Sequence, residues 1–216
     1  MIDILFPKLH KEGYRFLAIG GVVTFVLLLI SKFLGILSLI ITIWIYYFFR
    51  DPERFSINDE NYLLSPADGV ISQIIDVNGP EELGLKNKKY TRVSIFMNVF
   101  DCHVNRVPSS GKIMKIFYKP GEFINASLDK ASEKNERNYV KMTNSNGDEL
   151  ILVQIAGLIA RRIACEVEEN EETKQGNKFG MIRFGSRVDL YFGNYRIMVR
   201  QNQQTTGGES IIARKK

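Results

Sequence analysis

A glycine followed by a serine is the pair of residues whose types and order first suggest a reaction. Gly185 and Ser186 interrupt two apolar, strand-like runs within residues 181–192 (MIRFGSRVDLYF). The Ser186 hydroxyl can attack the Gly185 carbonyl and move the acyl group from nitrogen to oxygen. β-Elimination of that ester would cut the chain and leave a pyruvoyl group in place of the serine. Glycine favours this attack because it has no Cβ to shield its carbonyl and tolerates a strained backbone. Such pairs are common, however, and a plain β-bulge is the alternative interpretation.

One histidine and one aspartate are candidates to assist that hydroxyl. His103 follows a predicted strand and is the only histidine outside the N-terminal region, so an imidazole base has to be this residue. Asp68 lies in a turn-like Pro-x-Asp-Gly stretch. Together with Ser186 they would supply an orienting carboxylate, a base and a nucleophile. Each is also an ordinary turn residue by sequence, and their separation along the chain neither supports nor excludes the grouping.

The composition narrows the classes of partner and cofactor. The chain has 216 residues, a net charge of +5 and a pI near 9.1, which suits anionic lipid or nucleic acid. Nucleic acid is disfavoured because the sequence has no zinc-finger spacing and no arginine-aromatic RNA motif. Cys102 and Cys165 form no CxxC motif and the chain has only two histidines, so we expect neither a disulfide framework nor a metal. A reducing, cytoplasmic setting fits the folded part best.

The N-terminal quarter of the chain is apolar. Two apolar segments of about 15–17 residues each occupy residues 16–49, separated by Ser31 and Lys32. Helices that are apolar on all sides seldom sit inside a small domain, which favours a membrane hairpin over a buried globular one. Basic residues flank both outer ends, so the positive-inside rule places both ends in the cytoplasm. The sequence does not distinguish a hairpin that spans the bilayer from one that enters a single leaflet.

The rest of the chain is typical of a mainly β (α+β) fold. We expect a membrane-associating helical hairpin over residues 1–50 and a single β-rich domain over residues 51–216. Alternating apolar and polar residues predict strands over residues 91–99 and 111–118. Asn146-Gly147 and Gly193-Asn194 each predict a β-hairpin turn. The tail from Thr205 is glycine-rich and then basic, and it is expected either to be loose or to touch anionic lipid.

Several short motifs together resemble a known family. They occur in order along the chain, and they are Phe49-Arg50-Asp51-Pro52-Glu53-Arg54, Ser65-Pro66-Ala67-Asp68-Gly69, Asp101-Cys102-His103 through Pro108, Pro120-Gly121-Glu122-Phe123, Asn135-Glu136-Arg137, Gln154-Ile155-Ala156-Gly157 and Phe184-Gly185-Ser186. The chain resembles the phosphatidylserine decarboxylase proenzymes of the short, membrane-associated prokaryotic type. The resemblance covers essentially the whole chain after the hairpin.

The resemblance implies a self-processing enzyme of phospholipid biosynthesis. Cleavage between Gly185 and Ser186, assisted by His103 and Asp68, would give a β chain (1–185) and an α chain (186–216) that stay together as a heterodimer. The α chain would begin with a covalent pyruvoyl cofactor made from Ser186. Phosphatidylserine would form a Schiff base with that group and lose CO2 to give phosphatidylethanolamine. No metal is implied. The expected location is the cytoplasmic face of the cell membrane.

Two residues depart from the pattern of longer relatives. Those relatives have a second histidine where this chain has Arg106, and a threonine where it has Arg187. Because guanidinium groups bind phosphates and carboxylates well, we expect Arg106 or Arg187 to hold the substrate.

Other functions remain open at the level of sequence. A pyruvoyl decarboxylase for archaetidylserine or for a soluble amino acid shares the same chemistry. A membrane-tethered β-barrel binding or scaffold module, in which Gly185-Ser186 is a plain bulge, is the non-enzymatic alternative. The oligomeric state does not follow from the sequence.

Overall fold

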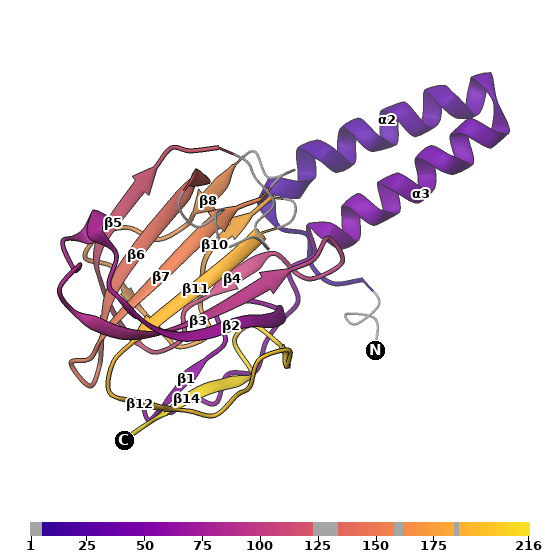
Figure 1. Ribbon diagram of the computed structural model, residues 1–216. Coiled ribbons are helices and arrows are strands. Elements are labelled where there is room, and N and C mark those ends of the chain that lie inside the picture. Colours follow the sequence, from indigo (N-terminus) through magenta and orange to yellow (C-terminus); the bar gives the residue numbers. More distant parts are fainter. Residues whose placement is uncertain (1–5, 123–133, 158–161, 184–185) are drawn as a thin grey trace. The chain divides into compact units, whose positions relative to one another are not determined.

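A computed structural model describes residues 6–122, 134–157, 162–183 and 186–216 (Figure 1). The chain divides into two compact units, residues 1–53 and 54–216. The first unit is helical, and the regular elements of the second are strands apart from one 3-10 turn, so the expected mainly β fold with an N-terminal helical pair is confirmed.

The helical unit is a hairpin whose polar side chains face inward. A short 3-10 turn, η1 (Lys11–Gly13), leads into α2 (Tyr14–Ile30), and α3 (Lys32–Phe48) follows after the extended residue Ser31. The Thr24 hydroxyl lies 2.9 Å from that of Ser38 and 3.1 Å from that of Thr42, so these groups satisfy one another between the helices. Most of the surrounding Leu, Ile, Val and Phe side chains are exposed.

Residues 11–30 are long and apolar enough to cross a membrane by length and composition, with a mean hydropathy of 2.0. The second helix, α3, is also apolar, but its 17 residues are one fewer than the 18 taken as the shortest candidate span. Hydroxyl groups between helices and apolar groups outside them are typical of helix pairs in lipid.

The second unit is built on an eight-stranded antiparallel sheet with the strand order β13-β2-β3-β11-β7-β6-β5-β9. Figure 1 shows its six longer strands, from β2 to β5, in this order. Its strands are β2 (Gly69–Asn78), β3 (Lys89–Met97), β5 (Gly111–Lys119), β6 (Arg137–Asn144), β7 (Glu149–Ala156), β9 (Glu172–Thr173), β11 (Ser186–Phe192) and β13 (Gln204–Thr205). A 3-10 turn, η2 (Glu81–Leu83), lies between β2 and β3. β11 pairs with β3 on one side and β7 on the other, so it is an interior strand.

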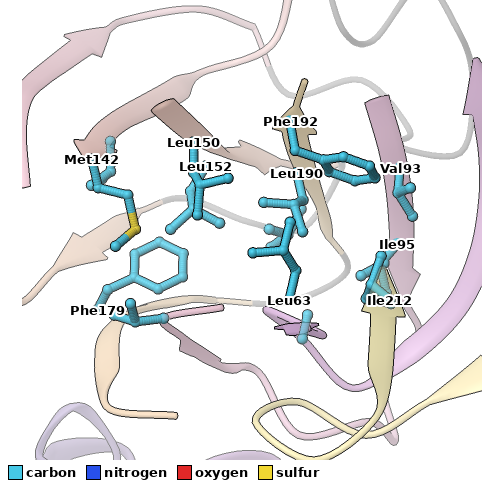
Figure 2. Close-up of a cluster of buried hydrophobic side chains, with 14 of the residues drawn as sticks. Leu63, Val93, Ile95, Met142, Leu150, Leu152, Phe179, Leu190, Phe192 and Ile212 are labelled. Carbon is cyan, nitrogen blue, oxygen red and sulfur yellow. The ribbon is translucent and has the colours of Figure 1, made fainter. Parts of the chain in front are cut away.

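Two smaller sheets contribute to the main core on one face of the large sheet. One has the order β1-β14-β12, with β1 (Tyr62–Leu64), β14 (Ile211–Lys215) and β12 (Tyr195–Ile197). The other has the order β4-β10-β8, with β4 (Val104–Arg106), β10 (Lys178–Ile182) and β8 (Ile163–Cys165). Figure 2 shows Leu190 and Ile95 of the large sheet meeting Leu63 and Ile212 of the first small sheet. We call this the inner face of the large sheet.

The other face of the large sheet, which we call the outer face, carries a second apolar cluster. It contains Leu83, Tyr90, Tyr139, Ile151, Val153, Ile155 and Tyr191. Because successive side chains of a strand point to opposite faces, β11 places Ser186, Val188 and Leu190 on the inner face, and Arg187 and Asp189 on the outer face.

The turn predictions had mixed outcomes. Asn146-Gly147 does join two paired strands, β6 and β7, and Gly147 has φ +79°, which glycine adopts without strain. The prediction for Gly193-Asn194 was wrong, because β11 and β12 belong to different sheets and the turn carries the chain from one to the other. The C-terminal tail is folded, since β13 pairs with β2 and β14 lies between β1 and β12.

Candidate active site

Ser186 lies at the edge of the large sheet where several strand ends meet. It begins β11 and is opposite Met97, the last residue of β3, and Ala156, the last residue of β7. Val70, near the start of β2, is opposite Phe96, so the segment that carries Asp68 reaches the same edge. The start of β6 is there as well, because Asn135 Nδ2 donates to the Ala156 carbonyl over 2.7 Å. Two of the sequence motifs, around Asn135 and Ala156, therefore meet at Ser186.

The Ser186 hydroxyl is fully buried and weakly bonded. Its Oγ lies 4.0 Å from the Met97 Sδ, which is the hydrogen-bond partner recorded for it within the described parts of the chain. A thioether is a weak acceptor, so this hydroxyl is not committed to a strong hydrogen bond. Gly185, the other half of the predicted cleavage site, lies outside the described residues.

His103 is fully buried just before β4. Its Nδ1 lies 3.0 Å from the Asp101 carbonyl oxygen. A carbonyl only accepts, so Nδ1 carries the proton and Nε2 is the basic nitrogen of the neutral ring. The His103 carbonyl accepts from the Ile182 amide over 3.4 Å, which holds this segment against the end of β10 shortly before Gly185.

Both oxygens of the Asp68 carboxylate accept hydrogen bonds. Arg54 Nη2 donates to Oδ2 and the Gly207 amide donates to Oδ1, each over 2.7 Å. The Arg106 amide donates to the Pro66 carbonyl over 2.9 Å, so the loop carrying Asp68 lies beside the strand that follows His103. The backbone thus brings the segments of Asp68, His103 and Ser186 to one edge of the domain.

A chain of buried amide side chains covers the inner face at this edge. Asn138 Nδ2 donates to Gln154 Oε1 over 2.9 Å, and Gln154 Nε2 donates to Asn105 Oδ1 over 2.8 Å. Asn105 Nδ2 then points at Met97 Sδ, 3.6 Å away. All three amides are buried, and they end at the sulfur that the Ser186 hydroxyl also contacts.

The two arginines differ in where they point. Arg106 is buried, and its Nη1 donates to the Gly176 carbonyl over 3.0 Å. Arg187 is buried on the outer face, where its Nε lies 2.9 Å and its Nη2 3.0 Å from the two oxygens of Asp189. Arg187 therefore faces away from Ser186, across the sheet. Substrate binding by either arginine stays a prediction.

Two ionisable groups near this end of the sheet have shifted pKa values. Burial lowers the pKa of the Arg183 guanidinium, three residues before Ser186. Burial and the nearby Glu136 carboxylate raise the pKa of the Tyr118 hydroxyl, at the end of β5. In the part of the chain that the structure describes, no three His, Cys, Asp or Glu side chains are grouped so that they could hold a metal ion.

Sequence reasoning missed the amide chain and the Gly207 contact to Asp68. The sequence did contain a signal for the Gly207 contact, because two consecutive glycines, Gly207 and Gly208, allow other segments to approach the backbone closely. A Cβ on Gly207 would lie 3.1 Å from the Ala67 backbone, and one on Gly208 would lie 2.8 Å from Arg106 Cδ. The amide chain had no local signal, because its members come from three strands of two sheets.

Comparison with known proteins places the chain in a family. Residues 41–213 match the family model described as phosphatidylserine decarboxylase. The chain belongs to the phosphatidylserine decarboxylase family. It is 61% identical to the phosphatidylserine decarboxylase proenzyme of Pelagibacter ubique (strain HTCC1062) over 215 residues, which is 100% of both chains. It is 50% identical to the proenzyme of the same name from Rickettsia typhi over 210 residues, 97% of this chain and 91% of that one.

These findings confirm the resemblance indicated by the motifs. The protein is an enzyme of this decarboxylase family, and the relatives named above are called proenzymes.

Proposed function

We propose that this enzyme converts phosphatidylserine to phosphatidylethanolamine and CO2 with a pyruvoyl group that it makes from its own Ser186. The observation that carries the proposal is the buried, weakly bonded Ser186 hydroxyl, set at the sheet edge with His103 and Asp68 on adjoining segments. The substrate is inferred from the relatives, which are named phosphatidylserine decarboxylase proenzymes.

Maturation on this account is a reaction of the chain with itself. His103 Nε2 takes the Ser186 hydroxyl proton while Oγ attacks the Gly185 carbonyl carbon. The bond between that carbon and the Ser186 nitrogen breaks, the nitrogen takes up a proton, and an ester joins the two residues. Loss of the Ser186 Cα proton then breaks the Cβ–Oγ bond and releases the Gly185 carboxylate. Water replaces the nitrogen of the remaining dehydroalanine, and ammonia leaves with formation of the ketone.

Asp68 has a supporting part in this step. Arg54 and the Gly207 amide each bind one of its oxygens over 2.7 Å, so the orientation of the carboxylate is fixed. The Pro66 carbonyl, in the same loop, accepts a hydrogen bond from the strand that follows His103. The fixed negative charge of Asp68 would then favour the imidazolium that His103 forms when it takes the proton.

The surroundings of Ser186 suit a small ketone in place of the hydroxymethyl group. Met97 and Ala156, its two neighbours on the adjacent strands, are fully buried and offer an apolar surface. When present, a pyruvoyl group supplies the electron sink for decarboxylation of an amine substrate. His103 is then the residue expected to hold a proton for Cα of the product, and the buried edge limits the access of water.

The cut chains would remain together. The α chain would supply β11, which pairs with β3 and β7, and β14, which pairs with β1. Both fragments therefore share the main core, and the expected product is a heterodimer of the β and α chains.

The helical hairpin is proposed to hold the enzyme at the cytoplasmic face of the cell membrane. Its exposed apolar side chains and internal hydroxyl contacts suit lipid as surroundings. A two-chain lipid presents its headgroup at that interface, so an anchored enzyme meets its substrate there. Deletion of residues 16–49 should move the protein from the floating vesicle fraction to the bottom fraction in a flotation assay with anionic vesicles. Retention of the shortened protein on the vesicles would assign the anchoring to the β domain instead.

The decisive experiment compares two buried serines of the same sheet. Ser186→Ala should stay uncut and inactive on phosphatidylserine vesicles, as judged by intact mass and CO2 release. Ser94→Ala is the matched control, because Ser94 is a fully buried serine on the adjacent strand β3, opposite Asp189. That variant should be cut at the same bond as the unmodified chain. Cleavage of Ser186→Ala would remove Ser186 as the nucleophile, and an uncut but active unmodified chain would remove the pyruvoyl group from the mechanism.

A further inference from the structure

The outer face of the large sheet holds a cavity that the proposed reaction does not use. Residues 78–82, at the end of β2 and in the turn after it, line one side, and side chains of β3, β6, β7 and β11 line the other. The Ser186 hydroxyl is on the inner face, so the sheet lies between it and this cavity. The volume of about 340 Å³ is at the lower end of the range of roughly 300–1,000 Å³ for small-molecule sites. The space suits a small organic molecule better than a single ion.

Two arginines line the cavity, Arg92 from β3 and Arg137 from β6. Their side chains are only 13% and 10% exposed. Removing a guanidinium group from water is costly unless anionic or carbonyl oxygens replace the water. The negative charge around each arginine therefore decides what the cavity can bind.

On one side of the cavity, Arg92 shares a carboxylate with another arginine. Arg187 Nε and Nη2 lie 2.9 and 3.0 Å from the two oxygens of Asp189, whereas Arg92 Nε lies 3.9 Å from the same carboxylate. Arg92 Nη2 donates to the Gln73 amide oxygen over 2.5 Å, which orients the guanidinium group without neutralising it. Among the described residues, one carboxylate thus faces two guanidinium groups here.

The same pattern occurs on the other side, at the turn η2. Lys119 Nζ donates to Glu82 Oε1 over 2.9 Å, and Arg137 Nη2 lies 3.6 Å from that oxygen. The remaining acid of the lining, Glu81, is bound by Lys86 over 3.0 Å. Each acid of the lining therefore has a closer cation outside it, and the two arginines leave the described lining with an excess of positive charge.

Tyr139 adds a hydroxyl beside one of the arginines. The Arg137 guanidinium lies over the Tyr139 ring, 5.6 Å from its centroid. The Tyr139 hydroxyl is buried near the Glu82 carboxylate, but it makes no hydrogen bond of standard geometry within the described residues. A ligand oxygen in the cavity would give this buried donor a well-formed bond.

The two guanidinium groups end at different places. In the sheet order β3-β11-β7-β6, two strands separate those of the arginines, so these strands lie roughly 14 Å apart. One guanidinium group ends near Asp189 and the other near Glu82. β7, which lies between the two strands, contributes Val153 and Ile155 to the lining. The cavity thus has an apolar surface between two positive ends.

We propose that this cavity binds a small organic dianion that has an acidic group at each end, such as a dicarboxylate. One acidic group binds Arg92, and the other binds Arg137 and accepts from the Tyr139 hydroxyl. Guanidinium pairs with carboxylates through two parallel hydrogen bonds, and the methylene groups of the ligand contact Val153 and Ile155. This inference does not depend on the reaction at Ser186.

The test measures the affinity of the full-length protein in detergent micelles for succinate, glutarate and adipate by titration calorimetry. Butyrate, pentanoate and hexanoate are the matched acids with one carboxylate. We expect at least one dicarboxylate to bind about tenfold more tightly than the monocarboxylate of the same length, since a second charged hydrogen-bonded group contributes at least that much. Equal affinities in all three pairs, or no binding of any dicarboxylate at millimolar concentrations, would overturn the proposal.

Substitution of either arginine should remove the advantage of the second acidic group. Arg92→Gln leaves Asp189 with Arg187, and Arg137→Gln leaves Glu82 with Lys119. Each variant should bind the preferred dicarboxylate about tenfold more weakly than the unmodified chain does. Unchanged affinity in either variant would overturn the assignment of one acidic group to each arginine.

Two further variants separate a binding role from general effects of charge and stability. Arg196→Gln removes an exposed arginine of β12, outside the cavity, and should leave the affinity unchanged. A loss equal to that of the cavity variants would reduce the effect to net charge and overturn the proposal. Tyr139→Phe removes only a hydroxyl and keeps the ring, so it serves where an arginine variant fails to fold. It should weaken dicarboxylate binding roughly fivefold, and unchanged affinity would count against the site.

Discussion

The two faces of β11 both bury polar side chains, but they give them different partners. On the outer face, Arg187 and Asp189 form a two-point ion pair, and Arg92 Nε lies 3.9 Å from the same carboxylate. On the inner face, the Ser186 hydroxyl and the Asn105 amide both end on the sulfur of Met97. Neighbouring residues of one strand thus have an oppositely charged partner on one side of the sheet and a weakly accepting thioether on the other.

This contrast suggests that the outer-face residues serve stability and the inner-face residues serve reactivity. Strong partners lower the energy of a buried group and make it unreactive, whereas a buried group with a weak partner retains its capacity to bind something else. The outer face also has a cavity of about 340 Å³, and its lining includes Arg92, Arg137, Glu82, Asp189, Tyr139 and Tyr191. We therefore expect changes on the outer face to alter folding free energy, and changes on the inner face to alter the rate of chain cleavage.

The largest effect is expected from the proposed base on the inner side. His103→Ala should slow cleavage by roughly 10²–10⁴-fold, since general base catalysis contributes that much. The measurement is the half-time of cleavage after cell-free synthesis. His10→Ala is the control, because His10 is the other histidine and its Nδ1 accepts from the Glu12 amide in the helical unit. Normal processing of His103→Ala would end the base assignment.

The outer ion pair should govern stability. Arg187→Met removes the nearer positive charge from the buried Asp189 carboxylate and leaves the more distant Arg92. Because a buried charge is then poorly paired, we expect the free energy of unfolding to fall by about 3 kcal/mol. Urea unfolding in a Ser186→Ala background, where the chain is uncut, gives the value. Adding Asp189→Leu should recover most of the loss, because the unpaired charge is then gone. A loss below about 1 kcal/mol would show that the pair is not buried in solution.

A smaller effect is expected from Glu149, at the opposite end of the outer face. Burial opposes its ionisation, but hydrogen bonds from Lys141, Tyr90 and Lys88 outweigh burial and lower its pKa from 4.5 to about 2. Because the folded pKa is below the unfolded one, its contribution to stability is complete above about pH 4.5. The contribution falls as the pH is lowered toward 2.

Glu149→Gln should therefore show a weaker loss of stability between pH 4.5 and pH 2 than the parent chain, as measured by urea unfolding at each pH. The comparison uses the Ser186→Ala background for both proteins. Identical slopes would mean that Glu149 does not keep these partners in solution.

Part of the site followed from the sequence because short motifs carry local information. Ser186 begins a strand, and His103 and Asp68 each stand directly before one. The opposite directions of Ser186 and Arg187 were also within reach, since they follow from the two-residue period of a strand once β11 is extended back to Ser186. The expectation that Arg187 holds the substrate stays a prediction.

Other features depend on contacts between distant segments. Gly207 donates to Asp68, and the tail pairs with β1 and β2, which precede it by more than a hundred residues in sequence. The turn at Gly193-Asn194 has hairpin residues, but the strand after it pairs with β14 rather than with β11. Local propensity can predict a turn, but it does not determine which strand the following segment pairs with. The division into three sheets therefore could not be predicted from the sequence.

The most direct test of the account is the intact mass of the denatured, fully active enzyme. We predict two chains, the smaller of which spans residues 186–216 and lacks a free terminal amine, with a mass lower by one ammonia than that of the same peptide beginning with serine. A single uncut chain in the active enzyme, or a small chain that begins with unmodified Ser186, would contradict it.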